Sequence, residues 1–218
     1  MAEAEADGWE TVSSDGDEAT SGSAVYQFKI ILKHLKPPIW RRILILNNST
    51  FAEFHSAVVG SMGWLGTHLH TFHARDKEIA PVNEKNDNSD INRLIMLMSG
   101  QCEEEKLDET KVKLFEHFKM PKDRILYVYD LDDGWEHSII LERILPYDSR
   151  PYYPICIAGE RACPPDDCGG VDSYEKLLKI LSDPNNPEHG DMKAWMNLKS
   201  NETYDSEAFD PISVRFVR

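Results

Sequence analysis

The chain has 218 residues, 41% of them hydrophobic, and a formal net charge of −14. This length suits one domain with a tail, and the acidic balance opposes nonspecific contacts with nucleic-acid phosphates. The N-terminus lacks the apolar stretch of a secretory signal, and no apolar run reaches the roughly 20 residues that span a bilayer. We therefore expect a soluble cytoplasmic protein, with a nuclear location left open and no membrane segment.

Residues 1–24 are predicted to form a disordered acidic tail, because acidic and small residues dominate them and Lys and Arg are absent. Within this tail, Trp9 and Val12 stand three residues apart among acids and serines. The pattern is similar to the short motif that autophagy-related ubiquitin-like proteins bind. A segment of that kind adds a strand to the partner's sheet and places its two apolar side chains in pockets. The alternative is an acidic tail with one stray Trp.

The folded domain is predicted to span residues 25–218 and to begin with a β-hairpin. β-Branched and aromatic residues predict strands at 25–33 and 39–46. Pro37 and Pro38 predict the turn between them, because proline fixes φ and lacks an amide donor.

A helix is predicted to follow this hairpin. Thr50 and Glu53 fit a capping box, in which each side chain accepts a hydrogen bond from the other residue's backbone amide. The side chains that follow at helical spacing predict its inner face: Phe51, Phe54, His55, Val58, Val59 and Met62. The helix is expected to end between Gly60 and Gly63.

The remainder of the chain mixes strands and helices. The expected elements are a strand at 64–73, a polar loop at 81–90, an apolar segment of ambiguous type at 91–98, a short helix at 112–118, strands at 124–130 and 135–144 joined by a turn at 132–134, helices at 172–181 and 187–197, and an extended segment at 211–217. Because no regular βαβ period is present, we predict an α+β fold. In it, two β-hairpins form a mixed or antiparallel sheet that is packed by several helices.

Four segments carry a family resemblance: residues 36–42, 62–72, 129–137 and 153–170. In order and spacing they resemble the plasmid pRiA4b ORF-3-like family, also described as a family of insertion-element passenger proteins. The resemblance covers roughly residues 25–215 and implies a shared fold but no settled activity. The chain departs from the family pattern by one extra residue or a shifted turn before Trp135, and by an Asp pair at 166–167 where Glu-Asp is common.

The segment 129–137 contains a candidate acid–base site, with Asp130, Asp133 and His137 as candidate catalytic residues. A His beside a carboxylate can be tuned for proton transfer, and the hairpin is expected to hold Asp130 and His137 close. The alternative is turn chemistry, in which the acids, Asp132 included, cap loop amides and His137 bonds Asp130. We favour this alternative, because no nucleophile with a flanking base and no phosphate-binding loop is recognisable.

Cys156, Cys163 and Cys168 form a candidate zinc site. In a reducing compartment, clustered thiols are free, metal-bound or redox-active. Cys163 and Cys168 enclose four residues, at the edge of the spacing typical of zinc ligands. The candidates for a fourth ligand share an imidazole: His68, His70 and His137. The alternative is that the thiols are small buried side chains that brace a loop with two prolines.

Histidines cluster at residues 68–73. On a strand, His68 and His70 would share one face and could hold a metal, with His55 approaching from the preceding helix, while His73 would face the other side. Taken singly, each is more typical of a partly buried structural histidine.

Arg41 and Arg42, beside Trp40, are candidate nucleic-acid contacts, because an aromatic ring and a guanidinium can stack on a base or bind phosphate. On a chain with a net charge of −14, we favour instead a strand with Trp40 inside and one Arg paired to a carboxylate.

We therefore predict a non-catalytic protein-interaction or adaptor module with a protein partner, such as an autophagy ubiquitin-like protein bound through Trp9 and Val12. The alternative is a zinc-dependent enzyme, or a zinc-stabilised nucleic-acid-associated factor of mobile-element origin, that uses His137 and the cysteines. Zinc is the one candidate cofactor.

Overall fold

The structure is a computed structural model that describes residues 24–82, 105–149, 151–199 and 201–216. Three expectations concern residues outside these ranges: the acidic tail with Trp9 and Val12, the polar loop apart from its first two residues, and the apolar segment at 91–98.

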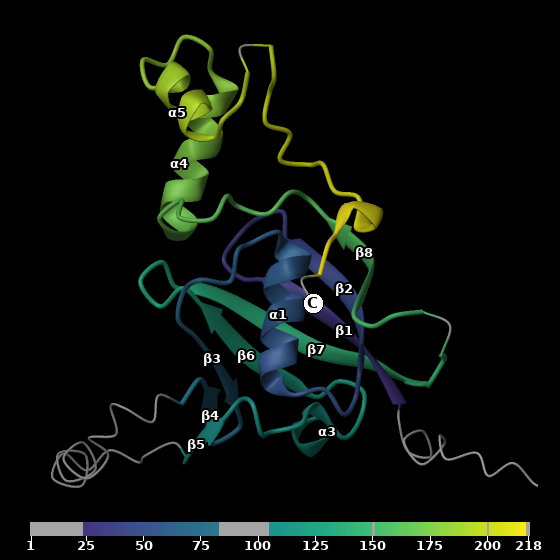
Figure 1. The fold of residues 1–218 in the computed structure, drawn as a ribbon. Helices are drawn as coiled ribbons and strands as arrows, with labels where there is room; N and C mark the ends of the chain where they lie inside the picture. The colour runs from purple at the N-terminus through teal and green to yellow at the C-terminus, as the bar shows by residue number, and fades with distance from the viewer. Residues whose placement is uncertain (1–23, 83–104, 150, 200, 217–218) are drawn as a thin grey trace, which may run out of the picture.

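One sheet of eight strands forms the centre of the described structure (Figure 1). The strands are β1 (Ala24–Leu32), β2 (Ile39–Leu46), β3 (His70–Ala74), β4 (Lys77–Ala80), β5 (Glu105–Asp108), β6 (Arg124–Tyr129), β7 (Trp135–Pro146) and β8 (Ile155–Glu160). Their spatial order is β5-β4-β3-β6-β7-β1-β2-β8. Every neighbouring pair is antiparallel except β4 with β5, so the sheet is mixed.

The helices complete the predicted architecture. They are α1 (Phe51–Met62), α3 (Leu114–His117), α4 (Gly170–Ser182), α5 (His189–Trp195) and the short 3₁₀ helix η1 (Pro211–Ser213). A mixed sheet with helices interspersed along the chain confirms the predicted α+β class. Within the residues that the structure describes, no helix combines the length and the apolar character needed to cross a membrane.

Both predicted hairpins are present and lie side by side in the sheet. β1 pairs with β2 from Val25 opposite Leu46 onward, and β6 pairs with β7 up to Tyr129 opposite Trp135. β7 also pairs with β1, so it joins the two hairpins. Alternate residues of β2 are buried, as expected for a strand with one face on the core.

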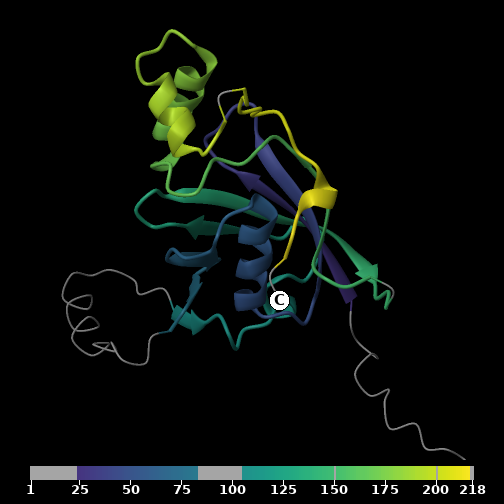
Figure 2. The same ribbon diagram turned by 45° about the horizontal axis from the view of Figure 1, so that its top comes forward.

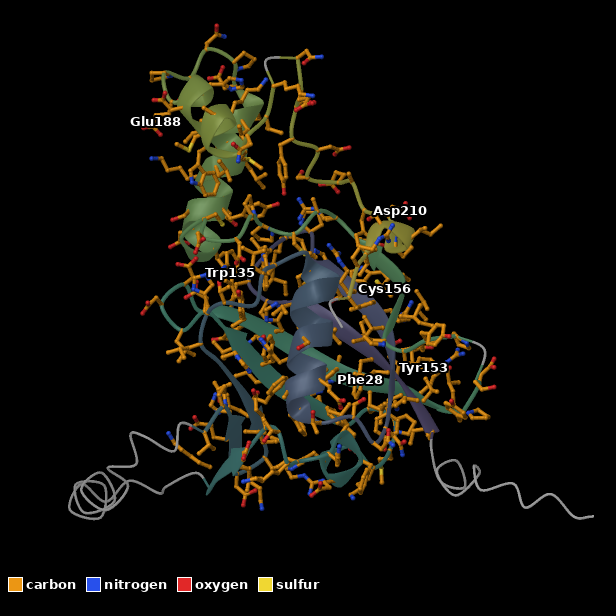
Figure 3. All side chains as sticks on the ribbon, viewed as in Figure 1. Phe28, Trp135, Tyr153, Cys156, Glu188 and Asp210 are labelled. Atoms are coloured by element: carbon orange, nitrogen blue, oxygen red, sulfur yellow. The ribbon has the colours of Figure 1, made fainter. Side chains whose placement is uncertain are left out.

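Helix α1 covers one face of the sheet (Figures 1 and 2). Its capping box is present: the Glu53 amide donates to Thr50 Oγ1 at 3.1 Å, and the Thr50 amide donates to Glu53 Oε2 at 2.7 Å. Gly63 ends the helix at φ 85°, a left-handed conformation that glycine adopts without steric cost. Phe54 of α1 lies against Phe28 of β1, with ring centroids 4.7 Å apart, and both rings are buried in the core. Figure 3 labels Phe28.

The predicted strand at 64–73 begins only at His70, and residues 64–69 form an irregular segment. Gly66 has φ 72°, which interrupts an extended conformation. The indole of Trp64 is buried and donates to the carbonyl of Pro164 at 2.9 Å, so a long-range contact fixes the path of this segment. His68 therefore precedes β3 and does not share a strand face with His70.

The sequence pattern does not predict β4 and β5, which have only four residues each, or β8, whose residues do not alternate between buried and exposed. The segment at 211–217 also differs from its expected extended form, because η1 occupies its start. The carboxylate of Asp210 accepts the amide of Ile212 at 2.9 Å and begins this helical turn.

Helices α4 and α5 correspond to the predicted helices at 172–181 and 187–197. They project beyond one end of the sheet, away from α1 (Figures 1 and 2). The loop that leads into α4 contains the Cys163–Gly170 part of the family signature, so the signature lies at the junction between the sheet and this helical projection.

Candidate functional site

Three signature segments meet where β6 ends and β7 begins: the irregular segment 64–69, the turn 130–134 and the loop 163–170. Three hydrogen bonds join them: Asp130 N to Leu69 O at 2.9 Å, Leu65 N to Asp166 Oδ2 at 2.9 Å, and Gly169 N to Asp133 Oδ2 at 3.0 Å. Residues far apart in sequence thus form one polar surface, which is the candidate functional site.

Left-handed backbone positions shape both acidic loops. Asp130 and Asp167 have φ of 55° and 61°, a region that Asp tolerates better than most residues. Asp130 Oδ1 accepts the amides of Asp132 and Asp133 at 3.2 and 3.3 Å, which is the turn chemistry expected of this segment. Gly170 lets the loops approach, because a Cβ there would lie 2.8 Å from the Asp133 carbonyl oxygen.

His68, Asp130 and Asp167 form the centre of the site. His68 Nε2 lies 2.9 Å from Asp167 Oδ1, and His68 Nδ1 lies 3.4 Å from Asp130 Oδ2. One ligand atom from each residue lies within 4.8 Å of the others. Asp130 is buried, whereas the Asp167 side chain is 69% exposed, so the cluster reaches from the protein interior to solvent.

Carboxylates dominate the electrostatics of this site. Five acidic residues come from two short segments: Asp130, Asp132, Asp133, Asp166 and Asp167. In the part of the chain that the structure describes, the ion pairs of Asp130 and Asp167 are with His68, and neither has a Lys or Arg partner. Burial and the nearby Asp133 carboxylate raise the pKa of the Cys168 thiol to about 12.

Tyr129 lies directly behind this cluster. Its ring contacts His68 edge-on at a centroid distance of 5.6 Å and stacks on Trp64 at 5.1 Å. Its hydroxyl is buried and has no partner at hydrogen-bonding geometry among the described residues. Burial raises its pKa, as does the Asp166 carboxylate, while the nearby backbone of residues 66–68 partly offsets this effect.

His137 does not join Asp130. It is fully buried on the inward face of β7, where its ring lies 5.4 Å from Trp64 and 5.3 Å from Tyr127. Neither ring nitrogen has a hydrogen-bond partner among the described residues. Burial lowers its pKa to about 4, although the backbone of Tyr127 and Trp135 lies close enough to oppose this shift. The structure brings Asp130 to His68 instead.

The three described cysteines are free thiols, and Arg41 lies near both Cys156 and Cys163. Cys163 Sγ lies 3.0 Å from Arg41 Nη2 and 3.2 Å from the Met62 sulfur, and burial raises its pKa to about 11. Cys156 lies on β8, which Figure 3 places well apart from Trp135 at the start of β7. Among the described residues, the one group of three close metal-ligating side chains contains none of these thiols.

The other histidines form a second buried polar group. His70 Nε2 lies 2.7 Å from Glu109 Oε2, and the His70 ring stacks on His55 at a centroid distance of 3.5 Å. His55 Nδ1 lies 2.8 Å from the Tyr127 hydroxyl, and burial lowers the His55 pKa to about 3, with His70 adding to the effect. His73 lies further along β3, opposite Leu126 of β6, so the structure separates it and His70 from His68.

Both candidate nucleic-acid residues are engaged within the protein. Arg41 is only 2% exposed, donates to the carbonyl oxygens of Ser61, Trp40 and Glu160, and stacks over Phe209 at 3.7 Å. Arg42 makes two bonds to the Glu142 carboxylate, at 2.6 and 2.9 Å. Trp40 is half-buried and donates to Glu160 at 2.9 Å.

Three leucines in the two segments that carry His68 and Asp130 are mostly exposed: Leu65 at 78%, Leu69 at 66% and Leu131 at 51%. We call them the leucine rim. Leu65 and Leu69 flank His68 in the irregular segment, and Leu131 follows Asp130 in the turn. The bond from the Asp130 amide to the Leu69 carbonyl holds the two parts of the rim together.

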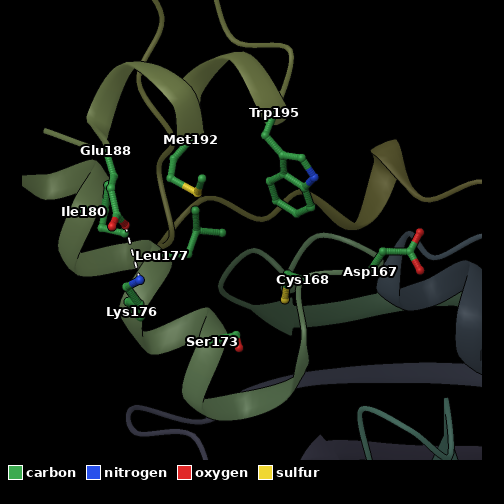
Figure 4. Close-up of a pocket in the computed structure, with 9 residues that line it drawn as sticks. All are labelled: Asp167, Cys168, Ser173, Lys176, Leu177, Ile180, Glu188, Met192 and Trp195. Atoms are coloured by element: carbon green, nitrogen blue, oxygen red, sulfur yellow. Dashed lines mark ion pairs between the residues drawn. The ribbon is translucent and has the colours of Figure 1, made fainter.

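A pocket of about 290 Å³ lies on the other side of the 163–170 loop, between α4 and α5 (Figure 4). Leu177 and Ile180 of α4 face Met192 and Trp195 of α5 across it. An ion pair between Lys176 and Glu188, 3.2 Å long, closes one end. Cys168 lies at the pocket, whereas the Asp167 carboxylate points away from it.

Sequence reasoning did not select Asp167 as a candidate ligand. Its signal is the Asp pair that precedes Gly169 and Gly170, which allow a left-handed turn and a close approach to the opposite loop. The exposure of the leucine rim has no sequence signal, because an apolar residue in a strand-like segment is expected to be buried.

Comparison with known proteins shows the family to which this chain belongs. The family model described as plasmid pRiA4b ORF-3-like protein matches residues 24–213, and the chain belongs to this family. The uncharacterized protein y4hQ of Sinorhizobium fredii is 29% identical over 187 residues, which cover 85% of this chain and 86% of that protein. A crystal structure of a protein of unknown function, MM3350 from Methanosarcina mazei Go1, matches with a TM-score of 0.72 at 33% identity and covers 89% of this chain and 99% of its own.

Proposed function

We propose that this protein is a non-catalytic interaction module whose partner-binding surface is the leucine rim with the carboxylates beside it. The exposure of Leu65, Leu69 and Leu131 on hydrogen-bonded loops carries the proposal. A single exposed leucine is ordinary, whereas several on adjoining loops are typical of a binding surface. Rigid loops also lower the entropy lost on binding.

The charge of this surface indicates the chemistry of the partner. Asp132 and Asp167 are exposed beside the leucine rim, and the whole chain carries a net charge of −14. A protein segment with apolar side chains flanked by Lys or Arg would complement both properties. The proposal is therefore a protein partner with a basic, apolar contact segment, and it disfavours nucleic acid and acidic partners.

Site-specific photo-crosslinking in cells tests this proposal. A photo-reactive residue in place of Leu131 should capture a discrete protein, whereas one in place of Ile212, which is 81% exposed on η1, should not capture it. The captured protein should bind the purified chain directly, and a Leu65→Asp/Leu69→Asp variant should weaken that binding at least tenfold. Equal capture from positions 131 and 212, or binding that the double variant leaves unchanged, would refute the proposal.

The tail provides a second interaction hypothesis that stands on sequence alone. Trp9 and Val12 lie outside the described residues, and their spacing supports binding to an autophagy ubiquitin-like protein by strand addition. Pull-down with a Trp9→Ala/Val12→Ala variant tests it, because recovery of such a partner should be lost. Unchanged recovery of the partner would refute the hypothesis for the tail, and the proposal for the leucine rim does not depend on this result.

The zinc-dependent alternative requires Cys156, Cys163 and Cys168 as thiolates, with an imidazole as fourth ligand. Burial raises the pKa of all three thiols, which disfavours thiolate formation without a metal. Elemental analysis of the purified protein tests whether the cysteines bind zinc. Near one equivalent of zinc that is lost in Cys163→Ser would support the alternative, and zinc far below one equivalent in both proteins would exclude it.

A further inference from the structure

We infer that His68, Asp130 and Asp167 form a binding site for one divalent transition-metal cation, a property beyond the proposed interaction surface. Bonds of about 2.0 to 2.2 Å from a metal ion to imidazole nitrogen and carboxylate oxygen place neighbouring ligand atoms roughly 3 Å apart. The separation of His68 Nε2 from Asp167 Oδ1 is 2.9 Å, and that of His68 Nδ1 from Asp130 Oδ2 is 3.4 Å. These two separations involve opposite nitrogens of the His68 ring, and one ligand atom from each of the three residues lies within 4.8 Å of the others.

The orientation of Asp130 leaves one oxygen available for the ion. Its Oδ1 accepts the two turn amides, and this anchors the carboxylate while Oδ2 faces His68. Outer hydrogen bonds of this kind orient metal ligands in proteins. Since His68 can offer only one unprotonated nitrogen to an ion, metal binding replaces its direct contact with a carboxylate by metal bonds.

The local charge supports a cation independently of these distances. Asp130 is buried, and an ionised carboxylate in a buried position requires compensation. Asp133 and Asp166 add further negative charge, and in the described part of the chain no Lys or Arg pairs with Asp130 or Asp167. A divalent cation would supply the missing positive charge.

The unpartnered hydroxyl of Tyr129 is a second, separate observation at this place. It is buried close to the backbone of residues 66–68 and to the Asp166 carboxylate, and it has no partner at hydrogen-bonding geometry among the described residues. A buried polar atom without a partner is uncommon in native proteins and indicates a missing water, ion or ligand.

The ligand types and their exposure indicate which ion would bind and how it would enter. One imidazole and two carboxylates suit Mn²⁺, Fe²⁺ or Zn²⁺ better than they suit the softer ions that thiolates select. Asp167 is 69% exposed and His68 is 29% exposed, so an ion can enter from solvent without unfolding. Three protein ligands would leave coordination positions for water or for an acceptor group from another molecule.

Titration with Mn²⁺, followed by electron paramagnetic resonance, tests the inference on the full-length chain. The wild type should bind one ion in a saturable manner, and Asp167→Asn should weaken this binding at least tenfold. Asp191→Asn is the matched control, because it removes the same charge from an exposed position on α5, outside the cluster, and it should change the affinity less than twofold. Pulsed measurements on the bound ion should show a ¹⁴N coupling that His68→Gln removes.

Three outcomes would overturn the inference: no saturable binding of Mn²⁺, equal affinity in the wild type and Asp167→Asn, or a bound ion without nitrogen coupling. Asp167 is exposed, so its substitution should leave the fold intact, and equal urea-unfolding midpoints of the variants verify this. The crosslinking result at position 131 does not depend on metal, so the two proposals can fail separately.

Discussion

Two polar regions lie on either side of Pro164 and Pro165, and they differ in how their charges are compensated. On one side, Arg41 is buried and Cys163 is partly buried, and the guanidinium has three carbonyl oxygens, a sulfur and an aromatic ring around it. On the other side, Asp130 and Asp167 have one imidazole between them. The first region has its hydrogen-bonding needs met inside the protein, whereas the second has negative charge left over.

This difference separates a structural site from a binding site. A buried cation with every donor satisfied braces the strands around it and offers nothing to a ligand. A cluster of carboxylates that reaches solvent can still gain from an external cation or a basic partner. The density of reactive side chains in sequence is similar on both sides of the prolines, so the decisive property is whether the charges are compensated within the protein.

The largest expected effect is the loss of stability in Arg41→Leu. The substitution leaves the carbonyl oxygens of Ser61, Trp40 and Glu160 without their donors in the core, and we expect the free energy of unfolding to fall by roughly 3 to 5 kcal/mol. Urea unfolding measures this loss. The control is Arg42→Leu, which removes the partly exposed ion pair with Glu142, and its free energy of unfolding should fall by about 1 kcal/mol. A loss of stability below 1 kcal/mol for Arg41→Leu would contradict the structural role that we assign to Arg41.

The next effect concerns acid stability and His137, which lies beneath Trp64 and thus between the two regions. Its pKa of about 4 in the folded protein lies below the ordinary value of 6.5, so the unfolded chain binds the proton more readily. Stability is therefore complete above about pH 6.5 and decreases as the pH falls towards 4, by roughly 3 kcal/mol in total.

His137→Phe should remove that part of the pH dependence. Because neither ring nitrogen has a hydrogen-bond partner among the described residues, the variant should keep nearly the wild-type stability at pH 7. His55, with a pKa of about 3, contributes a similar acid loss in both proteins, so the difference between the two pH profiles isolates His137. Identical profiles would show that His137 is accessible to protons in the folded state.

The reactivities of Cys163 and Cys168, which lie on opposite sides of Pro164 and Pro165, provide a direct comparison of the two regions. Burial raises the pKa of Cys163 to about 11 and that of Cys168 to about 12, so few thiolates exist at pH 8. In a Cys102→Ser background, we expect Cys163 to react with a disulfide reagent roughly a hundredfold, and Cys168 roughly a thousandfold, more slowly than in the urea-unfolded chain. Rapid labelling of Cys163 would mean that Arg41 stabilises a thiolate strongly enough to overcome its burial.

The smallest expected effect on stability is that of Asp167→Asn. The side chain is 69% exposed and contacts only a partly exposed imidazole, so the free energy of unfolding should change by less than about 0.5 kcal/mol. Calorimetry checks this in metal-free buffer. A large loss would place Asp167 with Arg41 among the structural residues and would weaken its assignment to the binding surface.

Much of the fold follows from local patterns in the sequence. The hairpin of β1 and β2, the hairpin of β6 and β7, the capped helix α1 and helix α4 all lie where residue type and spacing predict them. The strands β4 and β5 could not be predicted because each has only four residues, and β8 could not because its residues do not alternate between buried and exposed. Their partners in the sheet stabilise them.

Which site residues contact one another was less predictable from the sequence, because these contacts also depend on distant parts of the chain. A hairpin brings Asp130 and His137 close along the chain, yet strand alternation turns His137 into the core while the left-handed turn at Asp130 points its carboxylate towards His68. Whether His68 lies in a strand depends on Trp64, whose indole is held by the distant Pro164 carbonyl. Such long-range contacts are not visible in the local sequence.

The sequence alone therefore determined the family, the α+β class and the residue types that gather at the signature loops, because these depend on composition and short-range spacing. Only the tertiary structure decided which of those residues meet. It buried Arg41 beside Cys163, left the leucine rim exposed, and brought Asp167 to His68 and Asp130. The physical reason is that charge compensation and burial are properties of neighbours in space, and three loops from separate parts of the chain supply those neighbours here.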